Sequence, residues 1–138
     1  MKIHTKALNG LVVLMVCAQA QGKTQSLITI ADRLGCSKLY LEHVLTELKA
    51  HQWVQSIKGP QGGYRIHPQF NGSLLDVLSV LESAWVQPSL ADFKDPSLNH
   101  VLDTWVLKPL TLQLNHQLNQ VSILDLANAL QAESMYYI

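Results

Sequence analysis

Cysteine and charge are both scarce in this chain. It has 2 cysteines among 138 residues, and charged residues make up 14% of the sequence. Two cysteines are too few for a disulfide-stabilised fold, and we expect reduced thiols in a cytoplasmic protein. The apolar run from Leu11 to Ala18 is far shorter than the about 20 residues that a bilayer crossing takes. We therefore expect a soluble, cytoplasmic protein with no membrane partner, built as one domain or one core with a helical extension.

The N-terminal segment shares some features with a secretory signal, because Lys2 and Lys6 precede the apolar run and Ala18-Gln19-Ala20 stands at its end. The run is at the short end for such a signal, and its surroundings keep a helical pattern. We therefore predict a helix over residues 5–20 instead of a cleaved signal. The residues expected to share its apolar face are Leu8, Leu11, Val12, Met15 and Ala18.

Motifs of enzymes and metal sites are missing as well. The sequence has no Gly-x-Ser-x-Gly motif, no phosphate-binding loop and no dinucleotide fingerprint. The 6 histidines include no pair at metal-ligand spacing on one helix face. We predict that the protein is not an enzyme and holds no metal or other cofactor.

Charge is distributed unevenly, although the formal net charge is +0. Residues 1–70 hold eight Lys or Arg and three acids, whereas residues 71–138 hold two Lys and seven acids. The basic half favours a polyanionic partner, and the acidic, leucine-rich half favours a role away from that partner. The alternative is a basic face that is simply solvated.

Two capped helices with a tight turn between them are predicted after the first helix. Ser26 caps a helix over residues 27–34, and Gly35 ends it at the position that favours positive φ. Ser37 then caps a helix over residues 38–51. Two helices joined in this way form a helix-turn-helix.

The second of these helices has distinct buried and exposed faces. Its apolar residues at helical spacing are Leu41, Val44, Leu45 and Leu48. Its outer face is polar and partly basic, as expected of a helix that contacts bases. This outer face consists of Lys38, Leu39, Glu42, His43, Thr46 and Lys49, with Tyr40 at its border.

A glycine-rich hairpin is predicted over residues 53–67, with the loop sequence Gly59-Pro60-Gln61-Gly62-Gly63. Lys58 and Arg65 flank this loop, which suits contact with a phosphate backbone or a groove. Taken alone, the hairpin favours an ordinary surface turn with incidental charges. Because it follows three helices, it is the wing of a winged helix.

The predicted fold is therefore mainly α: a winged helix-turn-helix with a two-stranded β-hairpin wing over residues 1–70, and a helical dimerisation region over residues 71–138. Winged helices also occur in modules that bind only protein, so the fold does not decide the function. The basic balance of the first half favours DNA.

Two segments resemble the bacterial IscR/NsrR/CymR-type (Rrf-two) transcriptional regulators. They are Ser37-Lys38-Leu39-Tyr40-Leu41-Glu42 and the wing sequence Lys58-Gly59-Pro60-Gln61-Gly62-Gly63-Tyr64-Arg65. The segment from Ser122 to Leu126 is similar to the last helix of the family. The resemblance implies a winged-helix homodimer that binds palindromic double-stranded DNA, with a long helix after the wing as the dimer contact.

Many members of this family hold an iron-sulfur cluster through three cysteines in the loop before the dimerisation helix. The corresponding stretch here, residues 83–100, has no cysteine. Thiolates must converge on the irons, so we predict the cluster-free branch of the family. Cys36 adjoins a helix N-terminus, which makes it a possible redox thiol; a small apolar residue in the turn is the favoured alternative.

The expected DNA contacts come from three elements. The helix from Ser37 enters a major groove, where Glu42 can accept from cytosine and His43 can donate to guanine. The wing lies along the adjacent phosphates or minor groove. The full set of candidate DNA-binding residues is Thr5, Lys6, Ser37, Lys38, Tyr40, Glu42, His43, Lys58, Gly62, Gly63 and Arg65.

The second half offers a candidate dimer contact. Ser73 and Asp76 form a capping box for one helix, and Ser122 and Asp125 do so for the last. Between them Pro109 kinks or divides a long helix. Its candidate dimerisation residues are Leu98, Leu102, Trp105, Leu110, Leu114 and Leu118, for which an intramolecular core is the alternative.

Two functions are compatible with this sequence. The favoured one is a dimeric DNA-binding regulator, which we expect to act as a repressor and to respond to a small-molecule effector or a partner protein. The alternative is a winged-helix module that binds a protein or ligand and has lost DNA binding.

Overall fold

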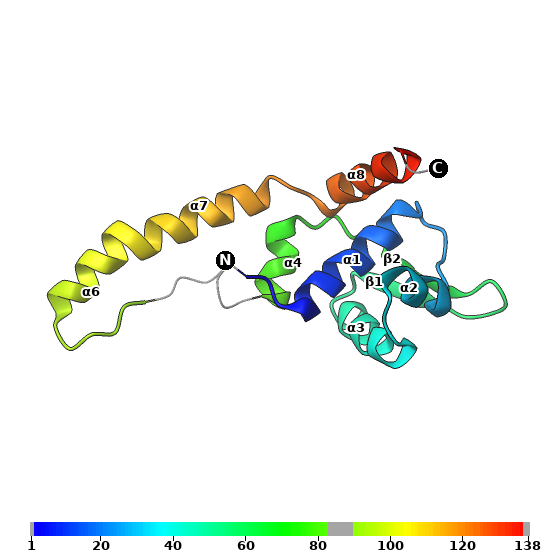
Figure 1. Ribbon diagram of the computed structural model, residues 1–138, viewed down its shortest axis with the longest axis horizontal. Helices are drawn as coiled ribbons and strands as arrows, with labels where there is room; N and C mark the ends of the chain where they lie inside the picture. The colour runs from blue at the N-terminus through cyan, green and yellow to red at the C-terminus, as the bar shows by residue number, and fades with distance from the viewer. Residues whose placement is uncertain (1, 83–89, 137–138) are drawn as a thin grey trace. The chain divides into compact units, whose positions relative to one another are not determined.

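The computed structural model describes residues 2–82 and 90–136 (Figure 1). Contacts divide the chain into two compact units. Unit 1 combines Met1–Gly72 with Ser122–Ile138, and unit 2 is Ser73–Val121. Within the described residues, the regular structure consists of helices and one antiparallel hairpin, as predicted.

Helix α1 (Thr5–Gln19) is the centre of unit 1, where it packs against α2, α3, β2 and α8. The apolar face expected from the sequence is partly wrong, because Leu8 and Val12 are exposed. The helix is apolar around most of its circumference, so the pattern alone does not show which side is covered. Its buried residues are Ala7, Gly10, Leu11, Val13, Leu14, Val16 and Cys17.

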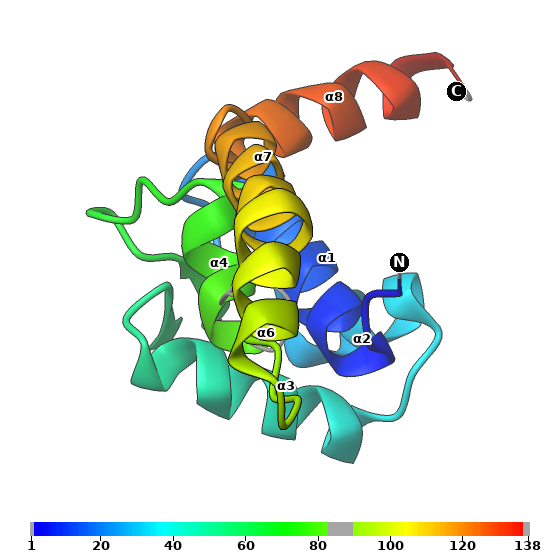
Figure 2. The same cartoon turned by 90° about the vertical axis from the view of Figure 1, so that its left-hand side faces the viewer.

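Helices α2 (Leu27–Leu34) and α3 (Lys38–Ala50) form the predicted helix-turn-helix (Figure 2). The Ser26 hydroxyl accepts from the amide of Thr29, which confirms the predicted cap. Gly35 takes φ 71° and donates its amide to the last carbonyls of α2. The stripe predicted on α3 is confirmed, since its buried residues are Leu41, Val44, Leu45 and Leu48.

Strands β1 (Val54–Ile57) and β2 (Gly63–Ile66) form the wing. They pair antiparallel with Val54 opposite Ile66 and Ile57 opposite Gly63. A third stretch of backbone joins them, because Gln25 forms a bridge with Tyr64. The Gln25 amide donates to the Tyr64 carbonyl at 2.7 Å, and the Tyr64 amide donates back at 2.8 Å.

The last helix, α8 (Ile123–Tyr136), lies in unit 1. The sequence assigned it to the helical region from residue 71, and the structure differs because α8 packs along α1 and buries Ile123 and Ala127. The side chain of Gln19 on α1 also donates to Gln131 on α8 at 3.0 Å. An α1 helix with apolar residues on nearly every side needs this extra cover.

Unit 2 contains α4 (Leu74–Leu81), α6 (Pro96–Leu102), the π-helical turn η1 (Asp103–Leu107) and α7 (Lys108–Asn119). The capping box of α4 is present as predicted, with both Ser73–Asp76 hydrogen bonds formed. The second predicted box, between Ser122 and Asp125 at the start of α8 in unit 1, is also present.

Pro109 neither breaks nor ends the helical backbone of unit 2. The π turn precedes it, and the Lys108 amide donates to the carbonyl of Asp103, five residues back. A proline in a regular α-helix clashes with the carbonyl four residues before it. The wider π turn accommodates that carbonyl, so α7 continues with Pro109 in its first turn.

Candidate DNA-binding surface

The N-terminal end of α3 is the first part of the surface. The Ser37 hydroxyl accepts from the Tyr40 amide at 3.1 Å, which caps the helix and leaves the hydroxyl proton available to donate. Lys38, Glu42 and His43 are exposed on the outer face, as expected. The helix therefore exposes a hydrogen-bond donor on Ser37, a cation on Lys38 and an acceptor on Glu42. Its apolar stripe stays buried on the opposite side.

Tyr40 has a positioning role as well as a place on this surface. Its side chain is half-buried, and its hydroxyl accepts from Asn9 Nδ2 at 2.9 Å. This bond connects α3 to α1. The Tyr40 hydroxyl can still donate its proton to a DNA phosphate.

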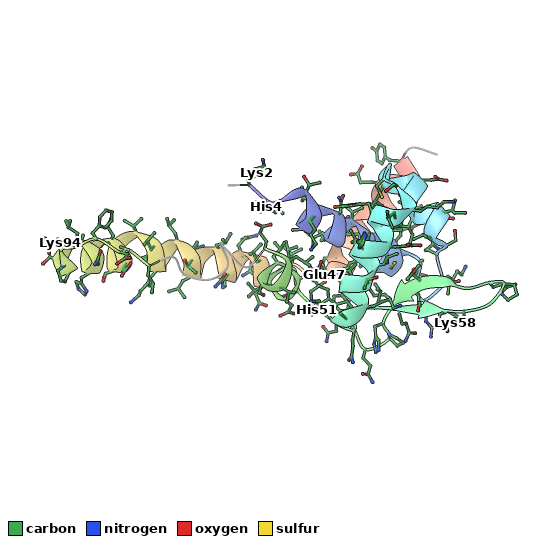
Figure 3. All side chains as sticks on the ribbon, turned by 90° about the horizontal axis from the view of Figure 1, so that it is seen from below. Lys2, His4, Glu47, His51, Lys58 and Lys94 are labelled. Carbon is green, nitrogen blue, oxygen red and sulfur yellow. The ribbon has the colours of Figure 1, made fainter. Side chains whose placement is uncertain are left out.

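Lys6 is less available to DNA than the sequence suggested. Its Nζ lies 2.9 Å from Glu47 Oε2 on α3, and the hydrogen bond and charge of Glu47 raise the pKa of Lys6. Figure 3 shows Glu47 on α3, from which it reaches α1. Thr5 is exposed at the first position of α1.

The two wing cations have different surroundings. Lys58 is exposed at the end of β1 and projects from the hairpin (Figure 3). Arg65 is half-buried and donates from Nε to Gln55 Oε1 at 2.6 Å, across the strand pair. The Gln55 bond fixes the Arg65 side chain and leaves the terminal nitrogens of its guanidinium to bind phosphate.

Gly62 and Gly63 were expected to let the wing approach DNA, and the structure gives both a role inside the fold. A Cβ at Gly62 would meet the carbonyls of Ile57 and Gly59 within the loop. A Cβ at Gly63, where φ is +152°, would meet the backbone carbonyl of Gln25. The glycines therefore keep the hairpin closed and admit the third stretch of backbone.

The anchor of the wing was missed in the sequence. Thr24 donates from its hydroxyl to the Gln61 carbonyl at 2.8 Å, and Gln25 pairs with Tyr64 just before Ser26 caps α2. The wing is thus tied to the first helix of the helix-turn-helix. Thr24 and Gln25 are polar and too few to show the alternating pattern that predicts a strand. The sequence did show Gly63, a residue type that often marks a close approach of another backbone.

The comparisons with known proteins agree with this geometry. The model of the Rrf2 family, described as "Iron-dependent Transcriptional regulator", matches residues 3–129. The chain belongs to the Rrf2 family. Together with the winged helix, this makes it a DNA-binding transcriptional regulator.

Two named regulators show how far the similarity extends. The HTH-type regulator CymR of Bacillus subtilis is 27% identical over 143 residues, which cover 100% of both chains. The solved structure of CymR, the global cysteine regulator of B. subtilis, has a TM-score of 0.75 and covers 94% of this chain and 98% of that one at 26% identity. The structure of T. potens IscR has a TM-score of 0.69 at 26% identity and covers 94% of this chain and 88% of that one.

The cysteines of this Rrf2 chain do not fit an iron-sulfur cluster. The whole sequence has 2 cysteines, and such clusters are held by several thiolates. Cys17 is buried in α1, and burial raises the pKa of its thiol to about 12. Cys36 is half-buried in the turn before α3. Within residues 2–82 and 90–136, no three His, Cys, Asp or Glu side chains gather where they could hold a metal ion.

The apolar residues of α6, η1 and α7 are mostly uncovered within this Rrf2 chain. Trp105 is 77% exposed and Leu110 65%, and no described residue of α6 or η1 is buried. Leu98 is exposed, and Leu102 and Leu114 are half-buried. Leu118 differs from the other candidate dimerisation residues, because it is buried within its own chain. The Leu118 side chain itself is therefore not available to a partner.

None of the helices formed by the described residues has the length and hydrophobicity that a membrane crossing requires.

Proposed function

We propose that this Rrf2 protein is a cytoplasmic, non-enzymatic repressor that binds a palindromic operator as a homodimer. Each protomer places the N-terminal end of α3 in a major groove and the wing along the neighbouring phosphates. The observation that carries this proposal is the hydrogen-bonded link from Thr24 and Gln25 to the wing. That link holds the exposed end of the helix-turn-helix and the two wing cations in one unit.

The distribution of charge supports DNA binding by unit 1. Unit 1 contains all eight Lys and Arg of residues 1–70 and five acids, whereas unit 2 contains two Lys and five acids. Phosphate contacts position a protein on DNA, and contacts with base edges specify the sequence. In this proposal Lys38, Lys58 and Arg65 position the protein, while Glu42 and His43 read bases.

Homodimerisation through unit 2 follows from its uncovered apolar surface. Monomeric proteins rarely expose a contiguous apolar patch of more than a few hundred Å². Unit 2 exposes Leu98, Val101, Trp105 and Leu110, which follow one another at intervals of three to five residues along one helical segment. A second copy is the simplest cover, because most homo-oligomers are twofold. A twofold dimer then reads half-sites about 34–36 Å apart.

The signal that controls binding differs from an iron-sulfur cluster in this proposal. The two cysteines lie in α1 and in the turn before α3, where they do not form a cluster site. In this proposal an effector molecule or a partner protein therefore regulates DNA binding.

The experiment is a DNA titration of the wild type and of Lys58→Ala and Arg65→Ala, repeated at several salt concentrations. Each change is expected to weaken binding to all sequences and to reduce the salt slope by about 1. Lys94→Ala, which removes an exposed lysine of unit 2, is the matched control and should leave both quantities unchanged. If neither wing change alters DNA binding, the proposed placement of the wing is wrong.

A further inference from the structure

Unit 1 contains a cavity that the DNA-binding surface does not use. Its volume is about 410 Å³, within the about 300–1,000 Å³ of typical small-molecule sites. Its walls come from the C-terminal end of α1, the end of β2, the segment after β2 and the start of α8. The lining residues are Ala18, Gln21, Gly22, Ile66, Phe70, Asn71, Gly72, Ser122, Ile123 and Leu124.

The chemistry of the walls defines the class of ligand. Five lining side chains are apolar and none is charged. Gln21 and Asn71 are exposed residues that line the cavity, and neither side chain has a hydrogen bond to any residue that the structure describes. Such a site favours an uncharged, mainly apolar molecule with one or two hydrogen-bonding groups, since a bound ion would have no partner charge.

The cavity is connected to the wing through its own walls. Gln21 and Gly22 have φ 54° and 86°, and the chain runs from them directly to Thr24 and Gln25, which hold the wing. On the other side, Ile66 follows Arg65 in β2. A ligand that moves either wall therefore moves a residue adjoining the wing anchor or a wing cation.

Phe70 provides a second connection to the hairpin. Its ring lies 6.0 Å from that of Trp53, just before β1. The Phe70 amide donates to the His67 carbonyl, and the His67 amide donates to the Trp53 carbonyl, both at 2.9 Å. The aromatic wall of the cavity is thus held by the base of the wing.

We propose that this cavity is an effector site for an uncharged, mainly apolar small molecule, and that its occupancy changes DNA affinity through the wing. The regulatory half of this inference rests on the proposed DNA binding, whereas the binding half does not. The energetic link between ligand and DNA is reciprocal, so each changes the affinity for the other by the same factor.

Indole and benzoate are suitable probes, because they are similar in size and only benzoate is charged. Amide NMR spectra of the full chain are expected to show saturable shifts with indole at Gly22, at residues 70–72 and at Ile123, and none with benzoate. Ala18→Leu fills the cavity, and Leu124→Trp narrows it from a residue that is 62% exposed. Both should weaken indole binding, whereas Met135→Trp, at a 67% exposed position of α8 outside the cavity, should not.

DNA titrations with and without indole then test the coupling, which is expected to change the apparent DNA affinity of the wild type by about fivefold or more. The change should disappear in Ala18→Leu and persist in Met135→Trp. The effector site is wrong if indole gives no saturable shifts or if both cavity variants bind it like the wild type. Bound indole with unchanged DNA affinity would contradict its regulatory role. A wild type that binds no DNA would instead contradict the proposed function, and the NMR titration would still decide whether the cavity binds the probe.

Discussion

Lys6 illustrates how a single ion pair alters the function expected of a residue. The sequence placed this lysine among the phosphate contacts, and the structure pairs it with Glu47 at 2.9 Å. A sequence pattern identifies a cation at the start of a helix, yet it does not reveal a carboxylate that lies 41 residues further along the chain. The same limit applies to Tyr40, whose bond to Asn9 spans two helices.

The ion pair gives a prediction about DNA binding. Lys6→Ala should lower DNA affinity less than Lys58→Ala does, because Glu47 already neutralises Lys6. Glu47→Gln should raise affinity and steepen the salt slope by about 0.9, since it releases one cation to bind phosphate. Fluorescence anisotropy of labelled DNA at several salt concentrations measures both effects. Equal losses for Lys6→Ala and Lys58→Ala would mean that the ion pair opens on DNA.

The Cys17 thiol should be unreactive in the folded protein. Cys17 is fully buried, and burial raises the pKa of its thiol from 9.0 to about 12. The unfolded chain therefore loses this proton first, and the stability contributed by the neutral thiol is present below pH 9 and lost between pH 9 and about 12.

Thiol labelling and unfolding test the burial of Cys17. The native Cys36→Ser variant should not react with 5,5′-dithiobis(2-nitrobenzoate) at pH 8 and should react once it is unfolded. Cys17→Ala should be less stable than the wild type at pH 8, and the difference should narrow as the pH rises from 9 to 11. Fast labelling of native Cys36→Ser would show that Cys17 is accessible.

At the scale of elements, local chemistry made the winged helix predictable. Ser26 and Ser37 fix the starts of α2 and α3, because each side chain accepts a hydrogen bond from a backbone amide of the first turn. Gly35 fixes the end of α2, because it adopts the left-handed conformation that ends a helix. The π turn before Pro109 was not predicted, since a proline in a helical pattern usually signals a kink or an end. The bridge formed by Gln25 was missed because its partner, Tyr64, lies in the wing.

Gly63 and Gly59 provide a matched test of the wing anchor. Both have positive φ, but only at Gly63 would a Cβ meet neighbouring backbone, that of Gln25. Gly63→Ala should lower the free energy of unfolding by about 1–3 kcal/mol, through backbone strain and loss of the Gln25 bridge. It should also weaken DNA binding.

Gly59→Ala has open space around the added carbon, so it should be less destabilising and should affect DNA binding less. Urea unfolding and DNA titration of both variants provide the measurements. If Gly59→Ala lowers stability and DNA affinity as much as Gly63→Ala does, the positive φ of each glycine explains the losses. The wing anchor then contributes little to stability or DNA binding.

For the whole molecule, the sequence indicated correctly that some apolar helical surface is not covered by the chain itself. It included too many residues in that uncovered surface. Trp105 and Leu110 are uncovered, whereas Leu118 is buried within its own chain and α8 belongs to unit 1. Helical periodicity identifies an apolar face, but it does not distinguish cover by the same chain from cover by a second copy.

Trp105→Glu should separate the proposed dimer without unfolding the protomer, because the side chain is 77% exposed in the single chain. Light scattering should give about twice the protomer mass of 15.4 kDa for the wild type and a single protomer mass for the variant. Leu90→Glu, at a 69% exposed residue outside the candidate dimerisation set, is a useful comparison. A monomeric wild type at micromolar concentration would contradict dimerisation through unit 2.

The most direct test of operator recognition is a titration of the purified protein on the DNA upstream of its own gene, with a scrambled duplex of equal length as control. We predict saturable binding of two protomers per site to the upstream DNA, with an affinity that falls as salt rises and clearly exceeds that for the scrambled duplex. Equal affinity for the two duplexes, or no binding to either, would contradict the claim that this winged helix recognises an operator.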